Sequence, residues 1–525
     1  MLTFSSLVFQ ILLFVYRIII TRFSGAGGMG IYQLAMPYYS ILSSISLAGI
    51  TMAVTRLTVE KSAVGDIKSS HTVTQTAIRM FLTLLALSAV VTFIFPDFIA
   101  GKILGDIRTK LSMLLFIPCL FFTGFENIYK SFFFGAKHLK PNIISENTEL
   151  SIRICALFIL LYMNRASLTP EKTAFLIVFG MIISEIFSFT FLGIYYKIYQ
   201  KKQTARTVTD RTKSAISANA GIKSLPEYKR KKKVFAEIFR IALPISASSI
   251  LMTVISSANT ILIPQRLVAS GMTQTNAIDI LGILMGMTYP LVTLPLIFIG
   301  PLMNVIFPRI ASAQKLGDIK EIKNKITKTL QTSSFLTFPA MGAVAALGQP
   351  LCILMYRNET AGKYIIPLML SSVFVYIQIV TGNILYALDK QKKLAVYNII
   401  DGILHVVCTY IFVAVPSLNV YGFMIGNFIS SVVGTVLNFS AVRKCVKFEF
   451  NFADFSQWFI LPAFAGVYTG FMTYFTYNFC IRFSIAPLLS VIIALLFSIV
   501  IYTAVLELKN ISVVKYISGL RKSRE

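Results

Sequence analysis

Long apolar stretches separated by short polar segments make up most of this chain. A helix that crosses a membrane needs about 20 largely apolar residues, and about fourteen stretches of the chain meet this requirement. The pattern predicts an all-α integral membrane protein with helices near residues 4–20, 31–55, 77–97, 111–136, 149–163, 173–197, 237–262, 277–307, 329–356, 363–387, 394–416, 420–444, 455–479 and 485–506.

Several landmarks in this pattern occur twice at a nearly constant offset, which indicates an internal duplication. A duplicated bundle of membrane helices is typical of transporters that alternate between two openings. The repeated landmarks are Pro37 and Pro290, Arg56 and Arg309, Gly-Asp-Ile-Lys at 65–68 and 317–320, Pro96 and Pro350, and Lys140 and Lys393.

The duplication also predicts the domain organisation. About six stretches precede a long basic segment and about six follow it, so the two copies have the same orientation and are parallel repeats. We expect a first lobe over 1–197, a linker over 198–236 and a second lobe over 237–446. The remainder, 447–525, holds two extra helices and a basic tail. For these helices we weigh structural packing against a second, lipid-facing groove.

The composition agrees with a membrane protein, and the charge sets its orientation. The chain has 525 residues, of which 56% are hydrophobic, a mean hydropathy of +0.73 and a net charge of +27. With the N-terminus inside, most of the 49 Lys and Arg fall in inner segments, as the positive-inside rule requires. We therefore expect a multi-pass protein of the cell (plasma) membrane with both termini cytoplasmic.

The densest basic run, Lys229-Arg230-Lys231-Lys232-Lys233, falls in the linker. We expect anionic membrane lipids to be its partners, because clusters of Lys and Arg beside a span attract acidic headgroups. We do not expect nucleic acid to bind, because a nucleic-acid site would interleave aromatic residues and Tyr228 is nearly alone.

The sequence gives no indication of catalysis, a cofactor or a metal site. The six cysteines are scattered without a C-x-x-C motif, and the three histidines are too dispersed for metal ligands. No nucleophile elbow or phosphate-binding loop occurs. We therefore expect a protein that is not an enzyme, has no cofactor and does not itself hydrolyse ATP.

Three arginines are candidates for substrate binding. Arg17 lies inside the first stretch, Arg22 lies near its outer end, and Arg266 holds the equivalent place in the second copy. Arg17 and Arg22 fall on different faces of a straight helix. Arg17 either snorkels to the outer interface or joins the other two around a cationic cleft. Guanidinium groups bind phosphate or pyrophosphate in such a cleft. Gln33 and Asn259 either line the cleft or pack between helices.

Other charged residues inside the stretches are candidate coupling or structural pairs, because an ionisable group in hydrocarbon needs a partner or water. Each of these pairs has the four-residue spacing of one helix face. Glu185 has no local partner, so it either meets a residue inside the lobe or stays protonated. The pairs are Glu126 with Lys130, Glu149 with Arg153, and Asp401 with His405.

Several segments resemble one known family. The segment TRFSGAGGMGIYQLAMP at 21–37 is similar to the opening of stage V sporulation protein B type proteins. The second half resembles the same family in ILIPQRL at 261–267, GILMGM at 282–287, FPRIA at 307–311 and Gly-Asp at 317–318. That family belongs to the multidrug, oligosaccharidyl-lipid and polysaccharide exporter superfamily, alongside the lipid II flippases.

The resemblance implies fourteen helices, with two six-helix lobes that form a V and two added helices that hold a lipid tail. It also implies movement of an undecaprenyl-pyrophosphate-linked saccharide, such as lipid II or a spore-cortex precursor, from the inner to the outer leaflet. Arg17, Arg22 and Arg266 match places where lipid II flippases carry cavity arginines. Cell-wall synthesis proteins are a further expected class of partner. The alternatives are a cation-coupled multidrug exporter, a membrane enzyme acting on lipid-linked sugars and a non-transporting scaffold.

Overall fold

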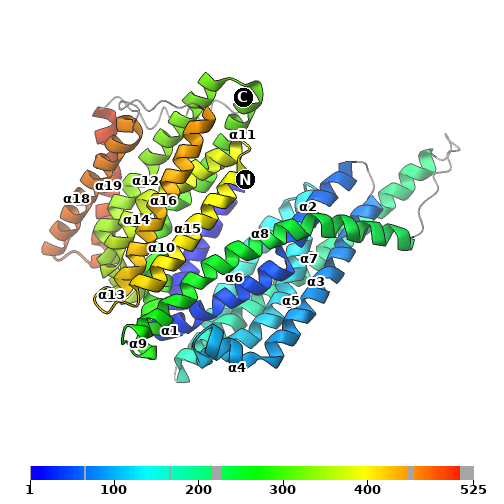
Figure 1. Cartoon of the computed structure of the whole chain (residues 1–525), viewed down its shortest axis with the longest axis horizontal. Helices are drawn as coiled ribbons and strands as arrows, with labels where there is room; N and C mark the ends of the chain where they lie inside the picture. Colours follow the sequence, from blue (N-terminus) through cyan, green and yellow to red (C-terminus); the bar gives the residue numbers. More distant parts are fainter. Residues whose placement is uncertain (1, 64–66, 165–166, 215–226, 447–454, 509–525) are drawn as a thin grey trace. The chain divides into compact units, whose positions relative to one another are not determined.

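The computed structural model describes residues 2–63, 67–164, 167–214, 227–446 and 455–508. Throughout these ranges the chain forms helices and no strand (Figure 1), which confirms the predicted all-α fold. Twelve of the described helical segments are long and apolar enough to cross a membrane. The protein is therefore a multi-pass membrane protein.

Contacts divide the chain into two compact units, Met1–Pro264 and Gln265–Glu525. The division falls inside one long helix, α8, which the sequence repeat places at the start of the second half. In the first unit, α5, α6 and α7 pack against one another and α1 packs against all three. The helices up to this point are α1 (Leu2–Ser46), α2 (Ala48–Ala63), α3 (Ile67–Ile94), α4 (Pro96–Phe98), η1 (Ile99–Ile103), η2 (Ile107–Thr109), α5 (Lys110–Gly135), α6 (Lys140–Met163), α7 (Pro170–Ser214) and α8 (Glu227–Ala269).

In the second unit, α16 packs against both α14 and α15, and α12 packs against α18. The helices are α9 (Gln274–Leu281), η4 (Gly282–Thr288), α10 (Tyr289–Thr293), η5 (Leu294–Phe298), α11 (Ile299–Leu316), α12 (Ile319–Tyr356), α13 (Glu359–Lys363), α14 (Ile365–Ala387), α15 (Gln391–Phe412), α16 (Val420–Val446), η6 (Ser456–Ile460), α18 (Leu461–Arg482) and α19 (Pro487–Leu508).

The helix boundaries differ from the expected stretches at three places. The second expected stretch, 31–55, continues from α1 into α2, and the break at Gly25 inside α1 separates it from the first stretch. The φ of 63° at Gly25 is one that glycine adopts readily. The expected short helix at 149–163 is part of α6, which begins at Lys140. Its added residues are polar and charged, so α6 is not among the twelve apolar helices. The count of fourteen spans stays a prediction.

The expected helix at 277–307 is irregular. The chain passes from α9 through a π-helix, η4, and a 3₁₀ helix, η5, before α11. Pro290 and Pro295 lie in this segment, and proline removes a backbone donor from a helix, which accounts for part of the change in winding.

Much of the expected linker, 198–236, is helical. α7 continues to Ser214 and α8 begins at Glu227. The basic run at 229–233 therefore falls in the first turns of α8. Residues 215–226 and the basic tail after 508 lie outside the described residues, and the domain boundaries drawn from the repeat stay a prediction.

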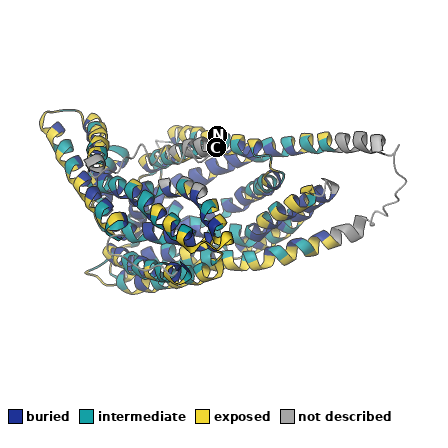
Figure 2. Ribbon diagram, turned by 90° about the horizontal axis from the view of Figure 1, so that it is seen from above, coloured by how far each residue is buried: buried dark blue, intermediate teal, exposed yellow. Residues whose placement is uncertain are grey.

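The two extra helices pack closely against the second unit. A Cβ atom added to Gly342 on α12 would overlap the carbonyl oxygen of Gly466 on α18, so only glycine lets these backbones approach. The other side of α18 exposes Phe464, Val467 and Phe471, three or four residues apart, each at least 64% exposed. Figure 2 shows exposed residues along such outer helix faces. This arrangement favours a packing role for α18 with one face toward lipid.

Candidate functional site: a buried charge cluster in the first unit

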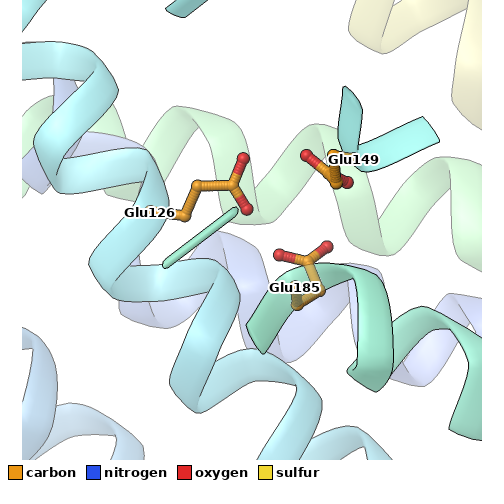
Figure 3. A group of neighbouring side chains, drawn as sticks. All are labelled: Glu126, Glu149 and Glu185. Carbon is orange, nitrogen blue, oxygen red and sulfur yellow. The ribbon is translucent and has the colours of Figure 1, made fainter. Parts of the chain in front are cut away.

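Five charged side chains of the first unit meet where α5, α6 and α7 pack together. Helical spacing explains part of the arrangement: Glu126 and Lys130 lie one turn apart on α5, and Glu149 and Arg153 lie one turn apart on α6. Glu185 approaches from α7. Figure 3 shows the three carboxylates pointing toward one another, and an oxygen atom of each lies within 4.8 Å of those of the other two. We call these five residues the charge cluster.

Lys130 connects the acidic side chains of α5 and α6. Its Nζ lies 2.5 Å from Oε1 of Glu126 and 3.6 Å from Oε2 of Glu149. It also lies 3.7 Å from Oε1 of Glu146, one turn before Glu149. A single ammonium group therefore serves carboxylates on two helices.

Arg153 connects α6 to α7. Its Nη2 donates to Oε1 of Glu149 and, over 2.9 Å, to Oε1 of Glu185. Its Nε donates to Oγ of Ser184 over 2.9 Å. The planar guanidinium suits this role, because its fixed donors reach several acceptors at once.

The charge cluster is enclosed. The side chains of Glu126 and Glu185 are 3% and 6% exposed, and that of Glu149 is 13% exposed. Glu146, which contacts Lys130 from outside the charge cluster, has a side chain that is 48% exposed and reaches the surface. Charges this deeply buried persist only when they are paired, which explains the dense network.

α1 closes the charge cluster with tyrosines. Tyr16 is 5% exposed and lies in electrostatic range of Arg153 and Glu149, and its hydroxyl group makes no hydrogen bond. Tyr32 also lies in range of Arg153, and its hydroxyl donates to Sδ of Met181 over 3.7 Å. The site therefore combines three carboxylates, two cations and phenols.

The structure brings together some of the residues singled out from sequence. The contacts expected within Glu126–Lys130 and Glu149–Arg153 are present. Of the two alternatives for Glu185, the structure shows the first, because it contacts Arg153 inside the unit. Sequence alone did not indicate this contact or the approach of Tyr16, because they join helices distant along the chain. Only the isolated acid in an apolar stretch pointed to Glu185. A metal site was not expected, yet the three carboxylates have the proximity that one would need.

The candidate arginines have different environments. On α1, Arg17 is half-buried and Arg22 is exposed, as expected for residues on different helix faces. Arg17 lies in electrostatic range of Tyr32, which is buried. In the second unit, Arg266 donates from Nε to the backbone oxygen of Tyr410 over 3.0 Å, and its guanidinium carbon lies 4.0 Å from the centre of that ring.

The remaining candidates lie on other elements. Asn259 on α8 is buried and Gln33 on α1 is half-buried. On α15, Asp401 interacts with Gln378 and Ser430, and the ring of His405 lies 5.0 Å from that of Phe423. The expected pairing of Asp401 with His405 stays a prediction.

The twelve candidate spans define a multi-pass membrane protein, and the repeat and the buried charges are typical of transporters. Two family models match the chain: the polysaccharide biosynthesis protein family over residues 1–314, and the lipid II flippase MurJ family over residues 230–513. Each covers more than half of the sequence. The chain therefore belongs to the polysaccharide biosynthesis protein family and, through its second half, to the lipid II flippase MurJ family.

Curated relatives agree with this assignment. The chain is 22% identical to stage V sporulation protein B of Bacillus subtilis (strain 168) over 471 residues, which are 88% of this chain and 86% of the relative. It is 22% identical to sporulation protein YkvU of the same organism over 85% of this chain and 94% of the relative. Identity to the lipid II flippase MurJ of that organism is 23% over 77% and 74% of the two chains.

Solved structures show the same fold. Lipid II flippase MurJ in an inward closed conformation matches with a TM-score of 0.66 and 15% identity, over 96% of this chain and 97% of that chain. An inward-facing multidrug transporter of the MATE family matches with a TM-score of 0.64 and 13% identity, over 84% and 96% of the two chains. At these identities the similarity concerns the fold, which flippases and drug transporters share.

Proposed function

We propose that this protein is a flippase that moves an undecaprenyl-pyrophosphate-linked saccharide from the inner to the outer leaflet by alternating access. The observation that carries the proposal is the match of residues 230–513 to the lipid II flippase family. The similarity to stage V sporulation protein B favours a cell-wall or spore-cortex precursor as the saccharide. Movement within the cell membrane needs no chemical step, so the protein acts as a transporter and not as an enzyme.

The arginines supply the chemistry for such a substrate. A pyrophosphate carries negative charge and many acceptor oxygens, and guanidinium groups bind it through paired hydrogen bonds while remaining charged. Arg22 is exposed, and Arg266 is held by Tyr410 through its Nε. We assign Arg17, Arg22 and Arg266 to the headgroup site, with Gln33 and Asn259 as polar lining. The basic linker binds anionic lipids, and wall-synthesis proteins are partners that supply or use the lipid-linked saccharide.

A cation-coupled multidrug exporter is the second candidate, because a MATE-family transporter shares the fold. A drug exporter of organic cations would need an acidic substrate site, whereas the acids of the charge cluster already contact Lys130 and Arg153. A non-transporting scaffold is the third candidate, and it would need no headgroup site.

Ligand-dependent stabilisation tests these candidates with purified protein. A ligand that binds only the folded state raises the melting temperature by mass action. We expect lipid II to raise the melting temperature of the wild type and to have little effect on that of Arg266→Ala. The control is Arg482→Ala, an exposed position on α18, which lipid II should stabilise as it does the wild type. Stabilisation by ethidium and not by lipid II would favour the exporter. Stabilisation by neither would favour the scaffold.

A further inference from the structure

We propose that the charge cluster is a proton-binding site and that it holds one exchangeable proton on Glu185. The inference concerns the first unit by itself, and it does not depend on which molecule the protein transports. It assigns a ligand, the proton, to a group of side chains that the arginine-based headgroup site does not use.

The charge balance of the cluster requires a further positive charge. Glu126, Glu149 and Glu185 carry three negative charges when ionised, whereas Lys130 and Arg153 carry two positive charges. The unbalanced charge lies in a membrane-spanning region, where an uncompensated charge costs several kcal/mol. One proton removes the imbalance.

Hydrogen bonding identifies Glu185 as the residue that carries the proton. Arg153 donates to Oε1 of Glu185, whereas Oε2 of Glu185 is enclosed and makes no hydrogen bond. Oxygen atoms of Glu126, Glu149 and Glu185 lie within 4.8 Å of one another, so a proton on one of them relieves the repulsion among all three. Glu126 has Lys130 at 2.5 Å, and Glu149 contacts both Lys130 and Arg153. The described cationic contact of Glu185 is with Arg153, which Glu149 shares, so the proton belongs on Glu185.

The existing contacts favour a proton over a metal ion. Lys130 already occupies Oε1 of Glu126, and Arg153 already contacts both Glu149 and Glu185. A bound Na⁺ or Mg²⁺ would add its charge beside two cationic side chains and would need several oxygen ligands at once. A proton needs only one oxygen atom.

The neighbouring groups on the other elements are phenols, a thiol and the guanidinium of Arg17, which lies in electrostatic range of Tyr32. Tyr39 on α1 and Cys119 on α5 lie in electrostatic range of Glu185, and Tyr16 on α1 lies in range of Arg153. In their neutral forms the phenols and the thiol add no charge, so they leave the balance of the cluster unchanged.

Glu146 gives the cluster a route to water. It is 48% exposed and 3.7 Å from Lys130, which in turn lies beside Glu126. When the proton binds, it comes from a hydronium ion, whose O–H bond breaks as an O–H bond forms at Oε2 of Glu185, and a neutral water molecule is left. On the orientation expected from the basic residues, this side faces the cytoplasm.

Infrared spectroscopy of the purified full-length protein tests the site without a transport assay. At pH 7 an ordinary exposed carboxyl, with a pKa of about 4, is ionised, so a carboxylic acid C=O band reports a protonated, shielded group. The samples are wild type, Glu185→Gln and the exposed control Glu60→Gln on α2, each in H₂O, in D₂O, and with Na⁺ replaced by K⁺.

We expect a C=O band in the wild type that shifts in D₂O, persists in Glu60→Gln, disappears in Glu185→Gln and does not respond to Na⁺. Persistence of every such band in Glu185→Gln would overturn the assignment, as would displacement of the band by Na⁺. If Glu185→Gln does not fold, the wild type still decides: the absence of a band that shifts in D₂O contradicts the proposal. Because no lipid is used, failure here leaves the flippase proposal standing.

Discussion

Arg153 on α6 donates a 2.9 Å hydrogen bond to Glu185 on α7, two residues that lie 32 positions apart in the chain. The same guanidinium also contacts Glu149 one turn earlier on its own helix. It therefore ties α6 to α7 through a buried hydrogen bond to Glu185 while it pairs with the carboxylate of Glu149. Removal of Arg153 leaves the buried charge of Glu149 with less compensation and removes the contact between the two helices.

Arg153→Met should destabilise the first unit strongly. Breaking a buried ion pair by removing one partner costs about 3–5 kcal/mol, because the remaining charge stays buried. Thermal unfolding of the purified protein measures the effect. The control is Arg56→Ala, which breaks an exposed pair with Glu60 that is worth at most about 1 kcal/mol. Similar melting temperatures for the two variants would show that the buried pair is not structural.

Gly342→Leu should loosen α18 from α12. The site has no room for a side chain, because even a Cβ would overlap the backbone of Gly466, and overpacking typically costs about 1–3 kcal/mol. The same substitution at Gly300, where a Cβ would meet nothing within 4 Å, is the control. Limited proteolysis near residue 450 should become faster in Gly342→Leu alone. Equal rates in the two variants would argue against close packing.

The orientation expected from the basic residues can be tested at the two ends of α7. Glu171 and Lys201 are both exposed and are 30 residues apart on the helix, about 45 Å. In a background without the native cysteines, Lys201→Cys should react with a membrane-impermeant maleimide only from the cytoplasmic side. Glu171→Cys should react only from outside. The reverse labelling pattern would show that the protein has the opposite orientation in the membrane.

The sequence predicted the helical class, because helical spans depend on local composition, whereas the arrangement of the repeat stays a prediction. It also predicted Glu126–Lys130 and Glu149–Arg153, because four-residue spacing determines which side chains share a helix face. The contact of Glu185 with Arg153 depends on how two helices pack, which spacing does not determine.

The sequence did not predict the start of α12. The expected stretch begins at 329, whereas α12 begins at Ile319, after Asp318, which accepts a hydrogen bond from the backbone of Glu321 as an N-cap does. The break at Gly25 falls between the expected stretches 4–20 and 31–55, so the apolar pattern indicated it. The irregular winding after α9 depends on packing and backbone geometry, and the apolar pattern alone gave no indication of it.

Arg266→Ala should leave the fold almost unchanged. Its contacts with Tyr410 are at an exposed site, where a cation–π interaction contributes about 0.5–1 kcal/mol. A small change in melting temperature together with a large loss of lipid-dependent activity would separate a binding role from a structural one. A large loss of stability would assign Arg266 to the fold instead.

The most direct test of the proposed function is the transfer of fluorescent lipid II between the leaflets of proteoliposomes. The samples are wild type, Arg22→Ala, Arg266→Ala and the control Arg482→Ala, all reconstituted at equal density. We predict transfer by the wild type and the control, and loss of transfer in the other two variants. A folded wild type that transfers no lipid II, or unchanged transfer by both Arg22→Ala and Arg266→Ala, would contradict the account.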